Sequence, residues 1–443
     1  MLIHRRGLLS LAIAVVLAVA AIEAVLPVAP VGATGKPAAF RPVIFVHGSA
    51  GSASQFESQT RRLTSNGYPI DVIEAHEYDS PNIATILPAV FAGLDERVSR
   101  LLARTGADQV DIVAHSLGTF VLQSYLASSP ARAARVAHYV NLDGRVATAP
   151  PGGVPTLAIW GEGDPARAIT GATNVYFPDQ SHTQTVSSEQ SFREMFRFFR
   201  GQPPHTARIV PSRGSARISG RAVLFPSNAG VTDATLEVFR VSPLTGKRLS
   251  SRPVHRAALT GDGSFGPVAL DGSARYEFAI VRPGAATHHV YFQPFLRDSA
   301  FVRLLTSRPG EGLGALVEAG DRHTALTISR QKEWWGDQGD AGDHLWVNGR
   351  DILNAANAPR VKRVIGIFAF DAGSDRTTDL TAPLPAFFAQ TFITGMDVFV
   401  PATPAHLGFV SIAVGPRGGG FELVNVPNWK SSEHRITVNV NDF

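Results

Sequence analysis

The stretch Val113-Ala-His-Ser-Leu-Gly-Thr119 places a serine between two residues that have almost no side chain. The apolar run from Val110 to Val113 predicts a buried strand before it, and apolar groups at helical spacing from Leu117 to Leu126 predict a helix after it. Ser116 therefore falls on a sharp turn from strand to helix. Such a turn lifts the serine hydroxyl clear of the backbone and is typical of a nucleophile elbow.

The residues two positions either side of Ser116 support this interpretation. Ala114 and Gly118 are small enough to let a strand and a helix pass closely. The usual pattern has glycine at both positions, and alanine departs from it by a single methyl group. The alternative interpretation is that Ser116 merely begins a helix as its N-cap.

Composition excludes several classes of protein. The chain has 443 residues, of which 44% are hydrophobic and 18% charged, as expected for a globular protein of two or three domains. The formal charge of +4 is not gathered into a basic stripe, so nucleic acid is not expected as a partner. The absence of cysteine removes disulfides, cysteine nucleophiles and thiolate metal sites.

The N-terminus predicts a secreted protein. Three basic residues, His4 to Arg6, precede an apolar run from Leu8 to Ile22, and this order is typical of a signal peptide, which we assign to residues 1–33. We therefore expect no stable membrane insertion after cleavage. The alternative is that an uncleaved N-terminal segment anchors the protein.

The rest of the chain divides into three regions. Strand and helix patterns alternate over residues 38–202, which predicts a mostly parallel sheet with helices on both faces. Beyond the Pro203-Pro204 linker, short alternating strands predict all-β sandwich or barrel modules over residues 206–308 and 309–443. Among the individual elements, we expect strands at 70–73 and 398–400 and a helix that carries Phe91 and Leu94 on its inner face.

A serine hydroxyl needs a histidine to take its proton and an acid to orient that histidine. Where a nucleophile elbow is used, these partners follow in the order serine, acid, histidine. Beyond Asp143, only His182 and His205 lie before the β modules. His182 follows an apolar strand, at the edge where ligands collect in such sheets, whereas His205 lies in the linker, so we predict His182 as the base.

Two aspartates compete for the role of the acid, because each ends a predicted strand. Asp143 lies in Val140-Asn-Leu-Asp-Gly144 and Asp164 in Trp160-Gly-Glu-Gly-Asp-Pro165. Either could instead be an ordinary turn residue. The spacing alone leaves both open.

Hydrolysis also needs two backbone N–H groups directed at the developing oxyanion. Leu117, directly after the serine, supplies one. The glycine-rich stretch His47-Gly-Ser-Ala-Gly-Ser52 follows the first predicted strand, and we expect Ser49 to supply the other. No lysine follows the last glycine, which excludes a phosphate-binding P-loop.

Three motifs carry a resemblance to a known family. With His47-Gly-Ser-Ala-Gly-Ser52, Ala114-His-Ser-Leu-Gly-Thr119 and Asn141-Leu-Asp-Gly144, the chain resembles secreted bacterial and archaeal lipases and esterases of the α/β-hydrolase superfamily that carry a C-terminal β domain. The resemblance implies an ester or lipid substrate met at an interface, a Ser-His-Asp triad with Asp143 as the acid, and no cofactor and no metal. It also implies a β domain that helps to bind long acyl chains, and a helical lid.

The sequence departs from the family where the lid is expected. The segment Asp79 to Val90 is too short for a helix-loop-helix flap. An uncovered site would suit a polyester depolymerase, which is the alternative enzyme. The alternative from another class is a non-catalytic surface-binding protein built on a hydrolase scaffold.

Overall fold

The computed structural model describes residues 40–403 and 407–441. The expected signal peptide, residues 1–33, lies outside the described residues. Within the described ranges, no helix combines the length and the apolar character needed to span a membrane.

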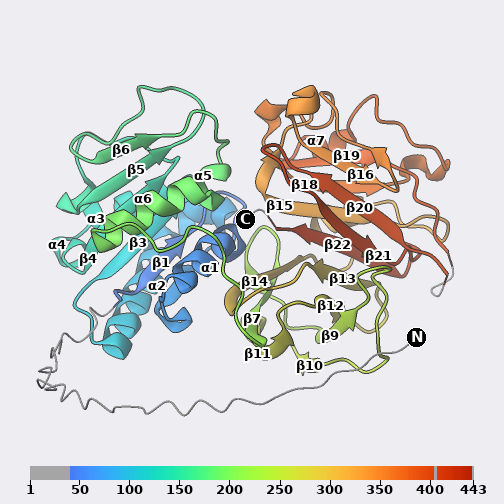
Figure 1. Cartoon of the computed structure of the whole chain (residues 1–443), viewed down its shortest axis with the longest axis horizontal. Coiled ribbons are helices and arrows are strands. Elements are labelled where there is room, and N and C mark those ends of the chain that lie inside the picture. Colours follow the sequence, from blue (N-terminus) through green and yellow to red (C-terminus); the bar gives the residue numbers. More distant parts are fainter. Residues whose placement is uncertain (1–39, 404–406, 442–443) are drawn as a thin grey trace, which may run out of the picture. The chain divides into compact units, whose positions relative to one another are not determined.

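The first region is built on a six-stranded sheet in which every pairing is parallel. The strand order is β2-β1-β3-β4-β5-β6 (Figure 1). The strands are β1 (Val43–Val46), β2 (Ile73–His76), β3 (Val110–His115), β4 (Val136–Leu142), β5 (Thr156–Trp160) and β6 (Thr173–Tyr176). The residues of β1, β3 and β5 are all buried, which explains why these segments are apolar without alternation.

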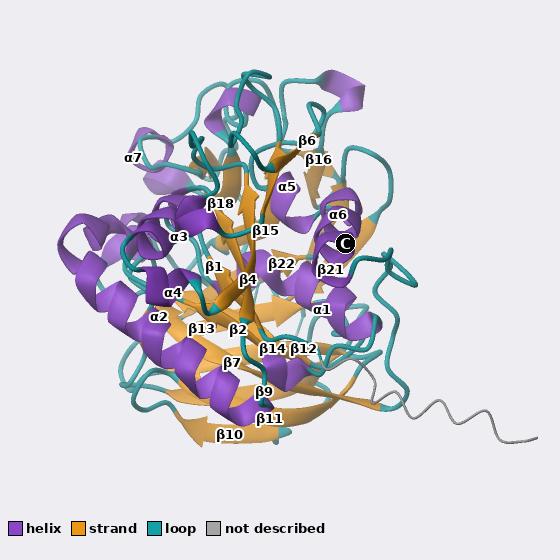
Figure 2. Cartoon of the chain, turned by 90° about the vertical axis from the view of Figure 1, so that its left-hand side faces the viewer, coloured by secondary structure: helices purple, strands orange, loops and turns teal. Residues whose placement is uncertain are grey.

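Helices cover both faces of this sheet (Figure 2). On one face, α2 (Ile83–Thr105), α3 (Leu117–Ala127) and the short α4 (Pro130–Ala133) pack around Ile44 and Val46. On the other face, α1 (Glu57–Ser65) and α6 (Glu189–Arg200) pack around Val43 and Phe45, and the short α5 (Gln184–Ser187) precedes α6.

Helix α6 illustrates how the sequence specifies these elements. Phe192, Phe196 and Phe199 recur at helical spacing and are all buried. The Ser188 side chain accepts a hydrogen bond from the Ser191 N–H at the start of the helix, and Gly201 ends it in the left-handed conformation with φ 69°.

Three expected elements differ from the structure. Residues 70–72 form a 3-10 turn, closed by a hydrogen bond from the Val72 N–H to the Pro69 carbonyl at 3.3 Å, and the strand begins only at Ile73. The strand expected at 398–400 is displaced to β19 (Ile393–Asp397). The helix that carries Phe91 begins already at Ile83, so most of the segment Asp79 to Val90 is the first part of α2 and contains no separate flap.

The remaining strands form three sheets. An eight-stranded sheet has the order β10-β9-β12-β13-β22-β15-β18-β19, and two four-stranded sheets contain β11-β7-β14 with β8 beside β7, and β17-β16-β20-β21. We call residues 206–308 the first β domain and residues 309–443 the second β domain. The first contains β7 (Ser215–Leu224), β8 (Ala229–Gly230), β9 (Thr235–Val241), β10 (His255–Ala258), β11 (Ser264–Asp271), β12 (Arg275–Val281), β13 (Thr287–Phe292) and β14 (Ser299–Thr306). The second contains β15 (Leu326–Trp334), β16 (His344–Val347), β17 (Arg350–Asp351), β18 (Val364–Phe370), α7 (Pro385–Phe388), β19, β20 (Val410–Gly415), β21 (Glu422–Val426) and β22 (His434–Val440).

One sheet runs through both β domains. Strand β22 pairs in parallel with β13 of the first domain and in parallel with β15 of the second. The two domains therefore share their backbone hydrogen bonding. The expected fold class, a parallel sheet covered by helices and followed by β modules, is confirmed.

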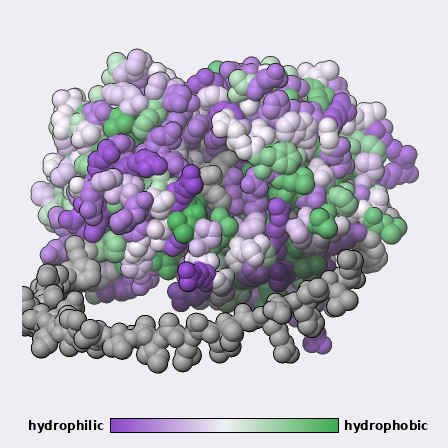
Figure 3. Space-filling model, viewed as in Figure 1, coloured by the Kyte–Doolittle hydropathy of each residue, from purple (hydrophilic) through white to green (hydrophobic). Residues whose placement is uncertain are grey.

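The surface of the β domains carries several exposed apolar side chains. The most exposed include Val361, Leu407, Leu244 and Phe421. Figure 3 shows hydrophobic residues gathered into patches among hydrophilic ones on this face of the molecule. Such side chains favour contact with an apolar surface.

Candidate active site

Ser116 lies at the strained turn that the sequence predicts. It connects β3 to α3 with φ 50° and ψ −120°, a backbone conformation that residues other than glycine rarely adopt. A methyl group on Gly118 would lie 2.5 Å from the Val46 carbonyl oxygen and 2.6 Å from that of His47. Helix α3 therefore starts against the end of β1, which only glycine permits.

The loop after β1 lies directly over this turn. A methyl group on Gly48 would come within 2.9 Å of both Ser116 Cβ and His115 Nδ1. The loop is tied down by hydrogen bonds from the Gly51 N–H to the Gly48 carbonyl (3.2 Å) and from the Ala50 N–H to Ser80 Oγ (2.8 Å). We call this loop, His47 to Ser52, the oxyanion loop. It lies next to Ser116, the predicted nucleophile.

The two predicted oxyanion donors are free of internal partners. In the described part of the chain, neither the Ser49 N–H nor the Leu117 N–H donates a hydrogen bond to another protein group. Leu117 is the first residue of α3, where backbone N–H groups lack helical partners. Both groups can donate to a ligand.

His182 and Asp143 are brought together. His182 Nδ1 lies 2.6 Å from Asp143 Oδ2, and both residues follow strands of the parallel sheet. The Gly161 N–H and Arg167 Nη1 donate to Asp143 Oδ1 at 2.8 and 2.9 Å. Burial alone would raise the pKa of the Asp143 carboxyl, but the hydrogen bond and charge of His182, with Gly161 and Arg167, lower that pKa to about 2.

The ionised carboxylate fixes the tautomer of the imidazole. Because the carboxylate can only accept, His182 Nδ1 carries a proton, and in the neutral imidazole Nε2 is then the acceptor. Among the described residues, Ser116 Oγ makes no hydrogen bond, and serine–histidine contacts often form only when substrate binds. The neighbouring His115 links the two segments, because its Nε2 donates to the His182 carbonyl at 3.2 Å.

The other two sequence candidates lie elsewhere. Asp164 is exposed, and its Oδ1 accepts the Ala166 N–H at 2.8 Å, as in an ordinary turn. His205 is exposed in the linker. Neither of them makes a hydrogen bond to the Asp143–His182 pair.

Two buried histidines of the site were not singled out by the sequence reasoning. Burial, reinforced by the charge of His182, holds the pKa of His115 well below its usual value, so His115 is neutral. Burial likewise lowers the pKa of His47. The His47 ring stacks on Tyr78 with centroids 4.3 Å apart and accepts the Tyr78 N–H at Nε2. Both histidines stand inside quoted motifs, but only their burial shows that they support the site.

The first β domain also holds the oxyanion loop. The Asn228 side-chain amide donates to the Gly51 carbonyl at 2.8 Å and to the Tyr78 carbonyl at 3.2 Å. Asn228 has φ 59° in the turn between β7 and β8, a conformation that asparagine tolerates.

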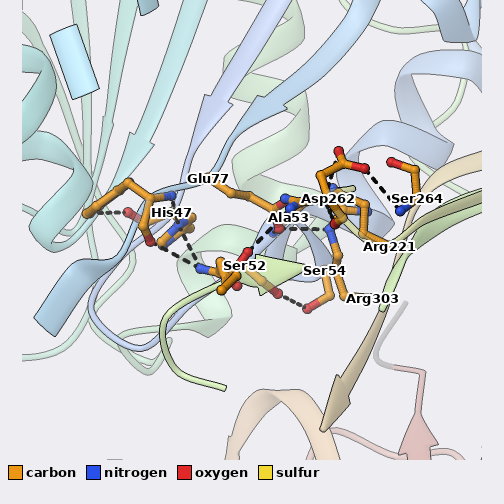
Figure 4. A network of polar contacts seen from close by, with 12 residues as sticks. His47, Ser52, Ala53, Ser54, Glu77, Arg221, Asp262, Ser264 and Arg303 are labelled. Atoms are coloured by element: carbon orange, nitrogen blue, oxygen red, sulfur yellow. Dashed lines mark hydrogen bonds and ion pairs between the residues drawn. The ribbon is translucent and has the colours of Figure 1, made fainter. Parts of the chain in front are cut away.

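A carboxylate beside the loop completes this connection (Figure 4). Glu77 accepts the Ala53 N–H at 2.8 Å, Arg303 Nε at 2.7 Å and Arg221 Nη1 at 2.8 Å. Burial favours the neutral acid, but Arg303 outweighs it and lowers the pKa of Glu77 to about 2. The oxyanion loop and β7 and β14 of the first β domain therefore share one buried ion cluster.

Residues 40–403 and 407–441 contain no group of three or more histidines and carboxylates that could hold a metal ion. The chemistry that the described site offers is that of a hydroxyl, an imidazole, a carboxylate and two backbone donors.

Comparisons with known proteins find family models that match separate parts of the chain. Residues 40–147 match the model of class 2 lipases, residues 214–309 match that of the lipase C-terminal domain, and residues 312–443 match a model of a further C-terminal domain. No curated protein sequence matches the chain.

Three of the solved structures that are similar to the chain match it over 38% of its length. Aspergillus fumigatus lipase B is 14% identical with a TM-score of 0.30, covering 38% of this chain and 54% of its own. A predicted CIB-like hydrolase from Thermoplasma acidophilum is 15% identical with a TM-score of 0.28, covering 38% and 89%. A gene product from Listeria innocua is 13% identical with a TM-score of 0.27, covering 38% and 97%. On these matches, the chain is similar to class 2 lipases over residues 40–147 and to the lipase C-terminal domain over residues 214–309, and its fold is that of an α/β hydrolase followed by β sheets.

Proposed function

We propose that the protein is a secreted carboxylic-ester hydrolase in which Ser116, His182 and Asp143 form the catalytic triad. The observation that carries the proposal is the 2.6 Å contact between His182 Nδ1 and Asp143 Oδ2 beside the strained turn at Ser116. The family match to class 2 lipases supports the same reading. Secretion rests on the sequence of residues 1–33 alone.

The reaction proceeds through an acyl-enzyme. Ser116 Oγ attacks the ester carbonyl while His182 Nε2 takes its proton, and Asp143 stabilises the imidazolium. The Ser49 and Leu117 N–H groups donate to the oxyanion, each contributing about 10²- to 10³-fold in rate. The protonated His182 then donates to the leaving alcohol, and water releases the acid by the reverse sequence.

We infer that the acyl group lies in a hollow that begins at the loop after β1. A hollow begins at Ala50 and Gly51 and is continuous with a second one through shared lining residues. The shared residues, drawn from both β domains, are Phe225, Leu305, Ser329, Gly366, Ile393 and Asn439. The apolar members of this set favour a long acyl chain, and hence a lipase, over a short ester alone.

A polyester depolymerase is the second candidate. It is favoured by one observation, that Asp79 to Val90 contains no flap that would exclude a bulky chain. Hydrolysis of an insoluble polyester film, measured beside hydrolysis of an emulsified triglyceride, separates the two functions. A higher rate on triglyceride supports the lipase.

Covalent labelling tests the nucleophile. A fluorophosphonate probe should label the wild-type protein and not Ser116→Ala. Equal labelling of both proteins, or none of the folded wild type, would contradict the proposal and favour a non-catalytic surface-binding protein.

A further inference from the structure

The loop that carries His182 donates hydrogen bonds to a glutamate of the second β domain. Glu333, on β15, accepts the Thr183 N–H at 2.7 Å and the Thr183 hydroxyl at 2.6 Å, and it also accepts the Ser181 hydroxyl. Ser181 and Thr183 are the two neighbours of His182 in the sequence. One side chain, distant in sequence, therefore fixes the backbone on both sides of the imidazole.

Glu333 is buried, and its carboxyl oxygens accept hydrogen bonds from the His182 loop. It has no exposed surface, and a carboxylate without water requires hydrogen bonds to its oxygens. The His182 loop supplies three of them. The loop is therefore the partner that satisfies this buried group, and the contact is a specific one rather than a surface ion pair.

Arg417 holds the same assembly from the second β domain. Its Nη1 donates to the Glu333 carbonyl and to Asp343 Oδ2, both at 2.5 Å, and its Nη2 donates to Ser181 Oγ at 3.1 Å and Gln184 Oε1 at 2.9 Å. The guanidinium also lies 3.8 Å from the centre of the Trp335 ring. Its own position is thereby fixed from several directions.

The opposite side of the loop is held by the hydrolase region. The His182 carbonyl accepts His115 Nε2 at 3.2 Å and Thr185 Oγ1 at 2.9 Å. Asp143 holds the ring at Nδ1. The direction in which Nε2 points is therefore set by Asp143 through the ring and by His115 and Glu333 through the backbone.

We propose that Glu333 is a positioning residue for His182, so that the second β domain is required to place the catalytic base. This inference rests on the proposed function, because it assumes that His182 takes the proton of Ser116. Among the described residues, the Glu333 carboxyl group accepts hydrogen bonds from the two neighbours of His182 and not from its ring or from Ser116. Its effect is on the rate of the chemical step rather than on substrate binding.

The test compares Glu333→Ala with Glu333→Gln. Alanine leaves Ser181 and Thr183 without their acceptor, and kcat for a p-nitrophenyl ester should fall about 10- to 100-fold, as for a misplaced catalytic group, while KM changes less than about twofold. Glutamine keeps one oxygen that can accept the Thr183 N–H. The hydroxyl groups of Ser181 and Thr183 can rotate to accept hydrogen bonds from its side-chain NH₂ group, so Glu333→Gln should keep most of the wild-type kcat.

A matched control separates positioning from general destabilisation. Glu277 is equally buried, lies on β12 of the same eight-stranded sheet and is bonded to Arg248 and His289 rather than to the His182 loop. Glu277→Ala should lower the thermal unfolding midpoint but leave kcat of the folded protein unchanged. An equal loss of kcat in both variants would overturn the proposal.

A second variant covers the case in which Glu333→Ala does not fold. Thr183→Val removes one hydroxyl donor to Glu333 with little change of shape, and it should lower kcat about three- to tenfold with KM unchanged. Wild-type kcat in Thr183→Val, with fluorophosphonate labelling of the wild type intact, refutes the positioning role alone. Absence of labelling in the wild type refutes the proposed function instead.

Discussion

Asn228 of the first β domain donates its side-chain amide to the backbone carbonyl of Gly51, in the loop that lies over Ser116, at 2.8 Å. The turn that carries Asn228 thus holds the same loop whose Ser49 N–H points to no internal partner in the described chain. A change in the β domain should therefore be felt in catalysis.

We expect Asn228→Gly to lower kcat about tenfold, because the oxyanion donor loses its support while the left-handed backbone at this position is retained. Steady-state kinetics on a short p-nitrophenyl ester measure the effect. Asn228→Ala should be less stable than Asn228→Gly, since alanine disfavours φ 59°. Unchanged kcat in both variants would show that the loop keeps its position without the amide.

The two aspartates should differ sharply in activity assays. Asp143→Asn should lower kcat by about 10⁴-fold, because an amide no longer holds the reactive tautomer of His182. Asp164→Asn, in an exposed turn, should stay close to the wild type. The reverse ranking would move the acid to Asp164.

Gly118→Ala should destabilise the hydrolase region by about 1–3 kcal/mol, since its methyl group would press on two backbone carbonyls of the β1 end. Denaturant unfolding measures the loss. Gly272→Ala is the control, because its methyl group would meet no atom closer than 3.4 Å. Equal stability of the two variants would contradict the close approach of α3 and β1.

Ionised Glu77 should make the folded protein less stable as the pH falls. Its pKa of about 2 lies below the usual 4.5, so its stabilisation is complete above pH 4.5 and is lost as the pH falls through about 2. The free energy of unfolding of the wild type should exceed that of Glu77→Gln by about 3 kcal/mol at pH 6, a gap that closes toward pH 2. Urea unfolding across this pH range would reveal a constant gap if Glu77 were not ionised in the folded protein.

If the hollow beside the oxyanion loop holds the acyl chain, filling it should lower activity on long-chain esters and not on short ones. Leu305→Trp should lower kcat/KM for p-nitrophenyl palmitate at least about tenfold while leaving the butyrate ester nearly unchanged, because Leu305 lines the hollow proposed for the acyl chain. Leu244→Trp, at an exposed position, is the matched control. Equal losses on both esters would place the acyl chain elsewhere.

Local patterns predicted the parts of the site that local structure determines. Ser116 and Gly118 follow from the alternation of strand, turn and helix, and His182 follows from the order of motifs. The choice between Asp143 and Asp164 could not be made from spacing, because both end strands and only the fold shows which one faces the imidazole.

Contacts between distant parts of the chain left no signal in the sequence. Glu333 stands 150 positions from Thr183, and nothing in its own neighbourhood marks it as a partner of the histidine loop. The same holds for β22, whose apolar alternation predicts a strand but not that it pairs with β13. Burial and pairing over such separations are properties of the packed molecule.

The central place of β22 has a consequence for the order in which the protein can be built. The parallel sheet is complete once β6 has been synthesised, and it can fold while the chain is still growing. Strands β13 and β15, by contrast, each have one edge that stays unpaired until β22 has been synthesised. Glu333, which holds the His182 loop, lies on β15. A growing chain can therefore form the turn at Ser116 early, but it fixes the position of His182 only after β22 has joined the sheet.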